Sequence, residues 1–113
     1  MDNLYCRCGC GLSKDDMNQP FLIQLYEAQS YSGNKFNFTS GIRCKDHNKK
    51  VGGSDTSSHL LGLAVDIECK TSRDRALIIK ALIKAGLDRI GIGKTFIHVD
   101  NDINKAQDVF WLY

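Results

Sequence analysis

The chain has 113 residues, of which 42% are hydrophobic and 25% are charged, and its formal net charge is +2. This length fits one core, so residues 1–113 are expected to form a single domain. Such a small net charge argues against nucleic-acid binding, although Lys45, Lys49 and Lys50 form a local basic cluster. No run of 18 apolar residues occurs, and the first residues lack the features of a signal peptide. We therefore expect no membrane partner and synthesis in the cytoplasm.

Five cysteines are present, three of them in the run CRCGC at positions 6–10. An odd, clustered set without a signal peptide favours reduced thiols over a disulfide framework. Two interpretations of Cys6, Cys8 and Cys10 stay open, a glycine-bearing turn with packed thiols or a second metal site. The run lacks the C-x2-C spacing that is usual in structural zinc sites, which favours packed thiols. The pattern predicts no role for Cys44 or Cys69.

The first predicted helix covers the stretch NQPFLIQLYEAQSYSG, with Asn18 as its cap, Pro20 near its first turn and Gly33 as its end. Helical spacing predicts a face formed by Leu22, Leu25, Tyr26 and Gln29. The next stretch, FNFTSG, alternates like a short strand. RCKDHNKKVGG is expected to be a loop with one helical turn that opens at Asp46.

The second half of the chain contains four more strands or helices of clear pattern, followed by a last strand. LGLAVDIEC is predicted as a strand, and TSRDRALIIKALIKAG as a helix that Thr71 and Asp74 cap and Gly86 ends. Its predicted buried stripe is Leu77, Ile78, Leu82 and Ile83. RIGIG, TFIHVD and VFWLY are predicted as three short strands. This order favours an α+β domain with a small, mainly antiparallel sheet and helices packed on one side.

Two of these strands combine an apolar face with a face that carries potential metal ligands. Because successive strand residues point to opposite faces, Asp66 lies opposite the apolar side of its strand, and His98 and Asp100 share the polar side of theirs. An ionised carboxylate in an apolar setting costs several kcal/mol unless a cation compensates it. With His59 in the preceding loop, two imidazoles and a carboxylate can converge on a catalytic zinc ion that keeps one position open for water. The predicted ligands are therefore His59, Asp66 and His98.

The pattern S-x-H-x-x-G-x-A-x-D at residues 57–66 and FIHVD at residues 96–100 resembles the zinc D-alanyl-D-alanine carboxypeptidase family. That family shares its fold with the hedgehog signalling domain and the vancomycin-resistance dipeptidases. The resemblance extends to SGIRCKDHNKKVGG and YCRCGCG, a layout typical of short phage and bacterial members. It implies a zinc peptidase that hydrolyses amide bonds next to D-amino acids in peptidoglycan. The family's ligands match His59, Asp66 and His98.

The resemblance also implies a role for Arg43, which matches an arginine that holds the substrate and polarises the scissile carbonyl. A fixed guanidinium stabilises an oxyanion or clamps a carboxylate, whereas the alternative for Arg43 is a surface ion pair. Ser57 is expected to orient His59 or its loop and to lie near the substrate. His47 is a further candidate at the substrate, with a surface or hydrogen-bonding histidine as its alternative.

The general base is the point at which the chain departs from the family. Several members carry a glutamate three residues before the last ligand, where this chain has Thr95. Asp100 is our candidate base, because residues i and i+2 on a strand share a face. The equally weighted alternative is that Asp100 holds a ligand imidazole. Asp102 is expected to be solvated beyond the end of the strand.

These observations predict a monomeric zinc metallopeptidase that acts on the stem peptides or cross-links of peptidoglycan, as a carboxypeptidase or an endopeptidase. An endolysin-like phage enzyme is the expected setting, and such an enzyme would reach the cell wall through a holin. One alternative is a catalytically silent, hedgehog-like zinc-binding domain, which Thr95 favours. The other is a nucleic-acid-binding module built on the cysteines and the basic loop, against which the weak net charge counts.

Overall fold

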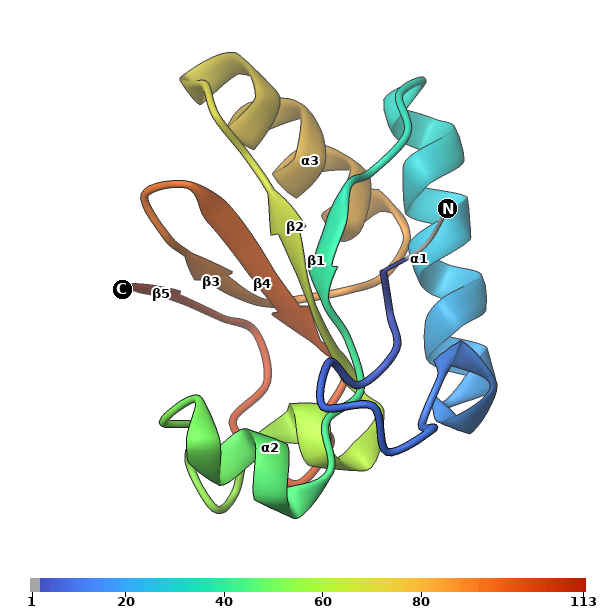
Figure 1. Cartoon of the computed structure of the whole chain (residues 1–113). Coiled ribbons are helices and arrows are strands. Elements are labelled where there is room, and N and C mark those ends of the chain that lie inside the picture. The colour runs from blue at the N-terminus through green and yellow to red at the C-terminus, as the bar shows by residue number, and fades with distance from the viewer. Residues whose placement is uncertain (1–2) are drawn as a thin grey trace.

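A five-stranded mixed sheet forms the centre of the fold, in the order β1-β2-β4-β3-β5 (Figure 1). The strands span Phe38–Ser40 (β1), Ala64–Glu68 (β2), Arg89–Ile92 (β3), Phe96–Asp100 (β4) and Val109–Leu112 (β5). Neighbouring strands are antiparallel except for β3 and β5, which are parallel. The computed structural model describes residues 3–113 and confirms the predicted α+β class with a mainly antiparallel sheet.

Two long helices cover one side of this sheet. They are α1 (Gln19–Ser32) and α3 (Ser72–Lys84), which also pack against each other (Figure 1). A shorter helix, α2 (Lys45–Lys50), lies at one end of the sheet next to the 3-10 turn η2 (Ser58–Leu61). A further 3-10 turn, η1 (Lys14–Asp16), precedes α1. None of the helices within residues 3–113 combines the length and the apolar character that a bilayer crossing requires.

The helix ends follow the predicted capping residues. Asn18 Oδ1 accepts a hydrogen bond of 2.9 Å from the amide of Phe21, and Gly33 ends α1 with a φ of 74°. Thr71 Oγ1 accepts one of 3.0 Å from the amide of Asp74 at the start of α3. The turn expected at Asp46 is a longer helix, because α2 begins at Lys45 with Cys44 as its cap.

The buried faces of the two long helices differ in part from the predicted stripes. α1 buries Phe21, Leu22, Leu25 and Ala28, whereas Tyr26 is 37% exposed. α3 buries Ile78, Ala81 and Leu82, whereas Leu77 and Ile83 are 37% and 49% exposed. The predicted stripes included large residues at helical spacing that stay partly exposed, and they left out Phe21, which is buried. Each helix instead buries a small alanine, Ala28 in α1 and Ala81 in α3.

The hydrophobic core lies between α1, α3 and the face of the sheet that they cover. Val65 and Ile67 of β2 and Ile97 and Val99 of β4 are fully buried in it. This confirms the predicted alternation of the two strands, since the intervening residues point to the other face. That other face is free of the two long helices, and its polar residues form the site described next.

Candidate metal centre

Three predicted ligands meet on the sheet face that lies away from α1 and α3. The ligand atoms of His59, Asp66 and His98 all lie within 4.8 Å of one another. The antiparallel register of β2 and β4 places Asp66 directly opposite His98, and His98 Nδ1 lies 3.1 Å from Asp66 Oδ1. η2 supplies His59, whose Nε2 lies 3.6 Å from the same oxygen. Gly62 ends this turn with a φ of 67°, which lets the chain enter β2 at once.

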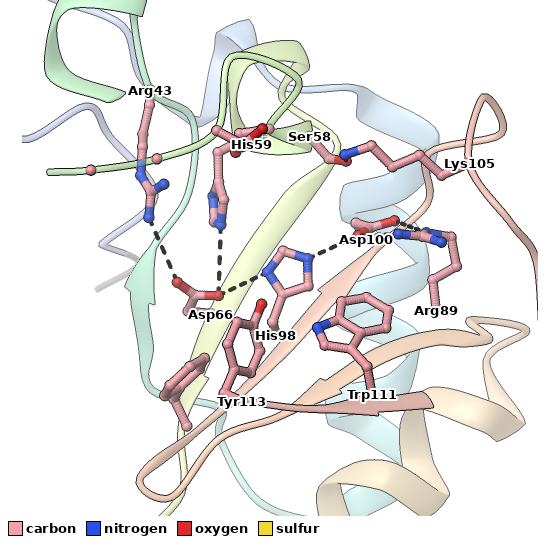
Figure 2. Close-up of a pocket in the computed structure, with 15 residues that line it drawn as sticks. Arg43, Ser58, His59, Asp66, Arg89, His98, Asp100, Lys105, Trp111 and Tyr113 are labelled. Carbon is pink, nitrogen blue, oxygen red and sulfur yellow. Dashed lines mark hydrogen bonds and ion pairs between the residues drawn. The ribbon is translucent and has the colours of Figure 1, made fainter. Parts of the chain in front are cut away.

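The second nitrogen of each imidazole is already bound by the protein. His59 Nδ1 is 2.7 Å from the carbonyl oxygen of Gly41, and His98 Nε2 is 2.8 Å from Asp100 Oδ2. Both oxygens accept, so these nitrogens carry protons. In the neutral form that binds a metal, the lone pairs would then lie on His59 Nε2 and His98 Nδ1, on the side of Asp66 (Figure 2). Two oriented neutral imidazoles and one carboxylate are a donor set that fits zinc.

The contacts between these residues shift the pKa values of Asp66 and His98. Burial alone would raise the pKa of Asp66, but the contacts with His59 and His98 outweigh it and hold the pKa well below its usual range. Burial would lower the pKa of His98, but its hydrogen bonds to Asp100 and Asp66 raise it. In the absence of a metal, a proton on His98 is stabilised by the two carboxylates beside it, and a divalent cation competes with that proton.

Asp100 lies on the side of His98 that faces away from Asp66, and it is only 2% exposed. Arg89 Nε donates to its Oδ1 at 2.6 Å, and the amide of Asp102 donates to that oxygen at 3.2 Å. Burial would raise the pKa of Asp100, but the bonds from His98 and Arg89 lower it. Its two oxygens are thus occupied by Arg89 and His98. Of the two roles weighed from the sequence, these contacts favour the holding of the His98 imidazole.

Arg43 stands on the other side of Asp66, where its Nη2 lies 3.8 Å from Asp66 Oδ2 (Figure 2). The guanidinium also donates to Ser40 Oγ at 3.2 Å and to Asn48 Oδ1 at 3.3 Å. Its backbone amide donates to the carbonyl of His59 at 3.1 Å. The group is therefore fixed beside the candidate ligands while its side chain keeps 18% exposure toward the cleft.

The remaining predicted residues divide between the site and its surroundings. Ser57 lines the cleft, and its Oγ accepts from the amide of His59 at 3.3 Å, as an orienting residue would. The described residues that line the cleft do not include His47, whose backbone amide donates to Cys44 Sγ instead. The expectation for Asp102 was wrong, because it is 2% exposed and accepts a 2.8 Å hydrogen bond from Ser58.

An open cleft of about 440 Å³ lies over these residues, within the usual size range of small-ligand sites. Sequence reasoning missed several of the side chains that line it, namely Ser58, Arg89, Phe96, Lys105, Trp111 and Tyr113. Gly91 lies opposite both His98 and Trp111 in the sheet. A Cβ atom there would come within 2.6 Å of Trp111 Nε1 and of Tyr113 Cε2. Gly91 is the feature of the sequence that could have predicted Trp111 and Tyr113 at the cleft, because its missing side chain lets these two aromatic residues cover His98.

Carboxylates are scarce in the cleft. Within the described part of the chain, the acidic residues that line it are Asp66 and Asp100. Thr95 is exposed in the turn between β3 and β4 and lines a different depression of the surface. The position that matches the family's glutamate therefore offers no proton acceptor here.

The family model described as peptidase M15 matches residues 1–100 of this chain. The matched range contains the three candidate ligands, Arg43 and Asp100. No curated protein sequence matches the chain significantly.

Proposed function

The chain belongs to the peptidase M15 family, and on this premise we propose that it hydrolyses an amide bond next to a D-amino acid in peptidoglycan. Members of this family are zinc-dependent metallopeptidases. The observation that carries the proposal is the convergence of His59, Asp66 and His98 in a cleft that also holds Arg43. The choice of stem peptides or cross-links as substrate rests on the resemblance of these motifs to zinc D-alanyl-D-alanine carboxypeptidases.

His59, Asp66 and His98 are the residues that would hold zinc. When bound, the ion supplies a Lewis acid for the scissile carbonyl and lowers the pKa of a coordinated water. The protein's part is to keep both imidazoles in the tautomer that this requires. The Gly41 carbonyl does so for His59, and Asp100 does so for His98.

Arg43 is proposed to bind the substrate through its guanidinium. Its contacts with Ser40, Asn48 and Asp66 hold the group at one wall of the cleft. A guanidinium presents paired N–H donors to a carboxylate or to an oxygen that gains negative charge. The same position serves a terminal carboxylate in a carboxypeptidase and a carbonyl oxygen in an endopeptidase.

Aromatic side chains are proposed to form the opposite wall of the substrate site. Trp111 lies with its ring centroid 5.6 Å from that of His98, and Phe96 and Tyr113 are 4.9 Å apart. Trp111 and Tyr113 shield His98 from water, and the three rings offer an apolar surface to the methyl groups of alanine residues.

One observation favours the second candidate, a non-catalytic zinc-binding domain of the same fold. Asp66 is a candidate ligand and Asp100 is held by Arg89, so neither carboxylate of the described cleft is free to accept a proton. Such a domain would use the cleft for recognition or stability.

The test is the fate of purified muropeptides after incubation with zinc-loaded protein, measured by mass spectrometry. Loss of one alanine from a pentapeptide stem identifies a carboxypeptidase, and conversion of a cross-linked dimer into monomers identifies an endopeptidase. His59→Ala should abolish either reaction. His47→Ala is the matched control, because this histidine lies outside the cleft. Unaltered muropeptides with zinc-loaded wild-type protein would overturn the catalytic proposal in favour of the silent domain.

An endolysin setting is part of the same proposal. A phage enzyme of this kind would be released to the cell wall through a holin. Expression in a bacterial host with and without a co-expressed holin tests it, and lysis that needs both the holin and His59 is the expected result.

A further inference from the structure

A second group of potential metal ligands lies outside the cleft and consists of Cys6, Cys8, Cys10 and Cys44, here called the cysteine cluster. Their Sγ atoms all lie within 4.8 Å of one another. The distances are 3.5 Å for Cys6–Cys8, 3.8 Å for Cys6–Cys44 and 3.5 Å for Cys8–Cys44. In a tetrahedral site with Zn–S bonds of about 2.3 Å, neighbouring sulfurs lie about 3.8 Å apart. The cluster therefore has the dimensions of a four-thiolate zinc site.

A turn, and not a strand, brings the first three of these sulfurs together. In an extended chain, Cys6 and Cys10 would be about 13 Å apart. Here the amide of Cys6 donates to the carbonyl of Leu12 at 2.9 Å, which closes the turn. Gly9 and Gly11 have φ values of 82° and 96°, which only glycine adopts readily. The glycines in the sequence thus give the C-x-C-x-C spacing the curvature that a C-x2-C loop has elsewhere.

Exposure argues against the packed-thiol interpretation that the sequence favoured. Cys8 and Cys10 are exposed, Cys44 is partly exposed and only Cys6 is buried. Thiols that gather for hydrophobic reasons should be removed from water, as Cys69 is with 1% exposure. All five cysteines, which lie in the described part of the chain, are free. Four free sulfurs within 4.8 Å of one another, two of them on exposed residues, need another reason to stay together.

Backbone amides donate to two sulfurs of the cluster. The amide of Cys44 donates to Cys6 Sγ, and the amide of His47 donates to Cys44 Sγ, each at 3.4 Å. Amide donors of this kind stabilise metal-bound sulfur.

We propose that the cysteine cluster binds a structural zinc ion that ties the N-terminal turn to the segment carrying Arg43. Each thiol that still holds a proton releases it to the solvent when the ion binds. The inference stands apart from the proposed function, because its ligands are distinct from the three residues of the cleft.

Because of the position of Cys44, this ion would link the N-terminal turn to residues that contact the cleft. Residues 41–44 reach the cleft at two points, since the Gly41 carbonyl binds His59 and Arg43 faces Asp66. The N-terminal segment contacts them at Leu4, whose carbonyl accepts from the amide of Ile42 at 3.1 Å. A Cβ on Gly41 would lie 2.5 Å from that carbonyl oxygen, so the two segments are in direct contact. An ion bound by Cys44 and by the cysteines of the turn would therefore link the two segments that meet at Leu4 and Ile42.

Metal content of the purified, reduced protein tests the proposal. We expect two zinc ions per chain for the wild type and one for His59→Ala, which removes a ligand of the cleft. Cys8→Ser should also retain one ion, and because Cys8 is exposed, the substitution removes no buried packing. Cys8→His should keep two ions, because imidazole replaces thiolate in many zinc sites. Cys69→Ser, at the cysteine outside the cluster, is the control and should also keep two.

Cobalt provides a second measurement that does not depend on activity. His59→Ala loaded with Co²⁺ should show the near-ultraviolet absorption of thiolate-to-cobalt charge transfer, and this absorption should disappear when Cys8→Ser is added. Absence of that absorption from the reduced wild-type protein loaded with Co²⁺ would overturn the proposal. So would a wild-type zinc content that does not exceed that of Cys8→Ser. A mass decrease of two hydrogens per pair of cysteines after purification in air, with no bound metal, would identify a redox pair instead.

Discussion

Replacement of Asp100 by asparagine separates the two roles that the sequence allows this residue. In the wild type, Asp100 Oδ1 accepts from Arg89 at 2.6 Å while Oδ2 accepts from His98 at 2.8 Å. An amide has one oxygen, so if Asn accepts from Arg89 it presents NH2 to His98. The imidazole must then accept at Nε2 and carry its proton on Nδ1, which is the atom that faces Asp66. The wrong tautomer blocks the nitrogen that zinc needs.

The expected losses of zinc affinity and of stability follow from the contacts of Asp100 with His98 and Arg89. Loss of the group that orients a ligand histidine lowers metal affinity about 10- to 100-fold, which corresponds to about 1.4–2.7 kcal/mol. Arg89 is 8% exposed and loses its countercharge. Removal of one partner from a buried ion pair costs about 3–5 kcal/mol, so the free energy of unfolding of the zinc-free variant should fall by about that amount.

The assay compares zinc affinity with turnover at saturating zinc. A positioning role predicts that Asp100→Asn binds zinc weakly but recovers activity to within about tenfold of the wild type when zinc is in excess. A general base would instead lose about 10²- to 10⁴-fold in rate with zinc fully bound. Unchanged zinc affinity together with such a loss would refute our reasoning. Asp102→Asn is the matched control, because this buried carboxylate contacts Ser58 and not His98. It should lower stability without a tenfold change in zinc affinity.

Three further predictions concern neighbouring parts of the site. Arg43→Lys keeps the charge but loses the paired donors, so kcat/KM should fall by a factor that corresponds to about 1.5–3 kcal/mol while zinc content stays the same; an unchanged kcat/KM would contradict the proposed substrate contact. Gly91→Ala places a Cβ against Trp111, so urea unfolding should show a loss of about 1–3 kcal/mol, and a stability equal to the wild type would mean that β5 does not pack as described. Because the folded-state pKa of His98 is raised above 6.5, its protonated form stabilises the zinc-free protein below pH 6.5, and this stabilisation is lost as the pH rises through the folded-state pKa. The melting temperatures of zinc-free wild type and His98→Gln should therefore converge as the pH rises, and a gap that widens would show that the sign is wrong.

Local pattern was enough to predict the outward-facing ligands. The alternation of β2 and β4 determines that Asp66 and His98 leave the core face, whatever the strands pair with. The same holds for the helix caps at Asn18 and Thr71, whose bonds reach only three residues along the chain. The helix faces were harder, since Leu77 and Ile83 are apolar yet exposed. Which part of an apolar stripe is buried depends on the partner helix, and the partner is not local information.

The sequence by itself therefore determined the α+β class, the strands and the side of each strand on which a ligand lies. Only the tertiary structure decided which groups meet: Arg89 pairs with Asp100 because β3 and β4 share a register. It also brought Cys44 to a turn more than thirty residues earlier and Trp111 onto His98 through the parallel pairing of β5. The physical reason is that side-chain direction repeats with the geometry of one element, whereas contact between elements depends on a register and a packing that the whole core selects.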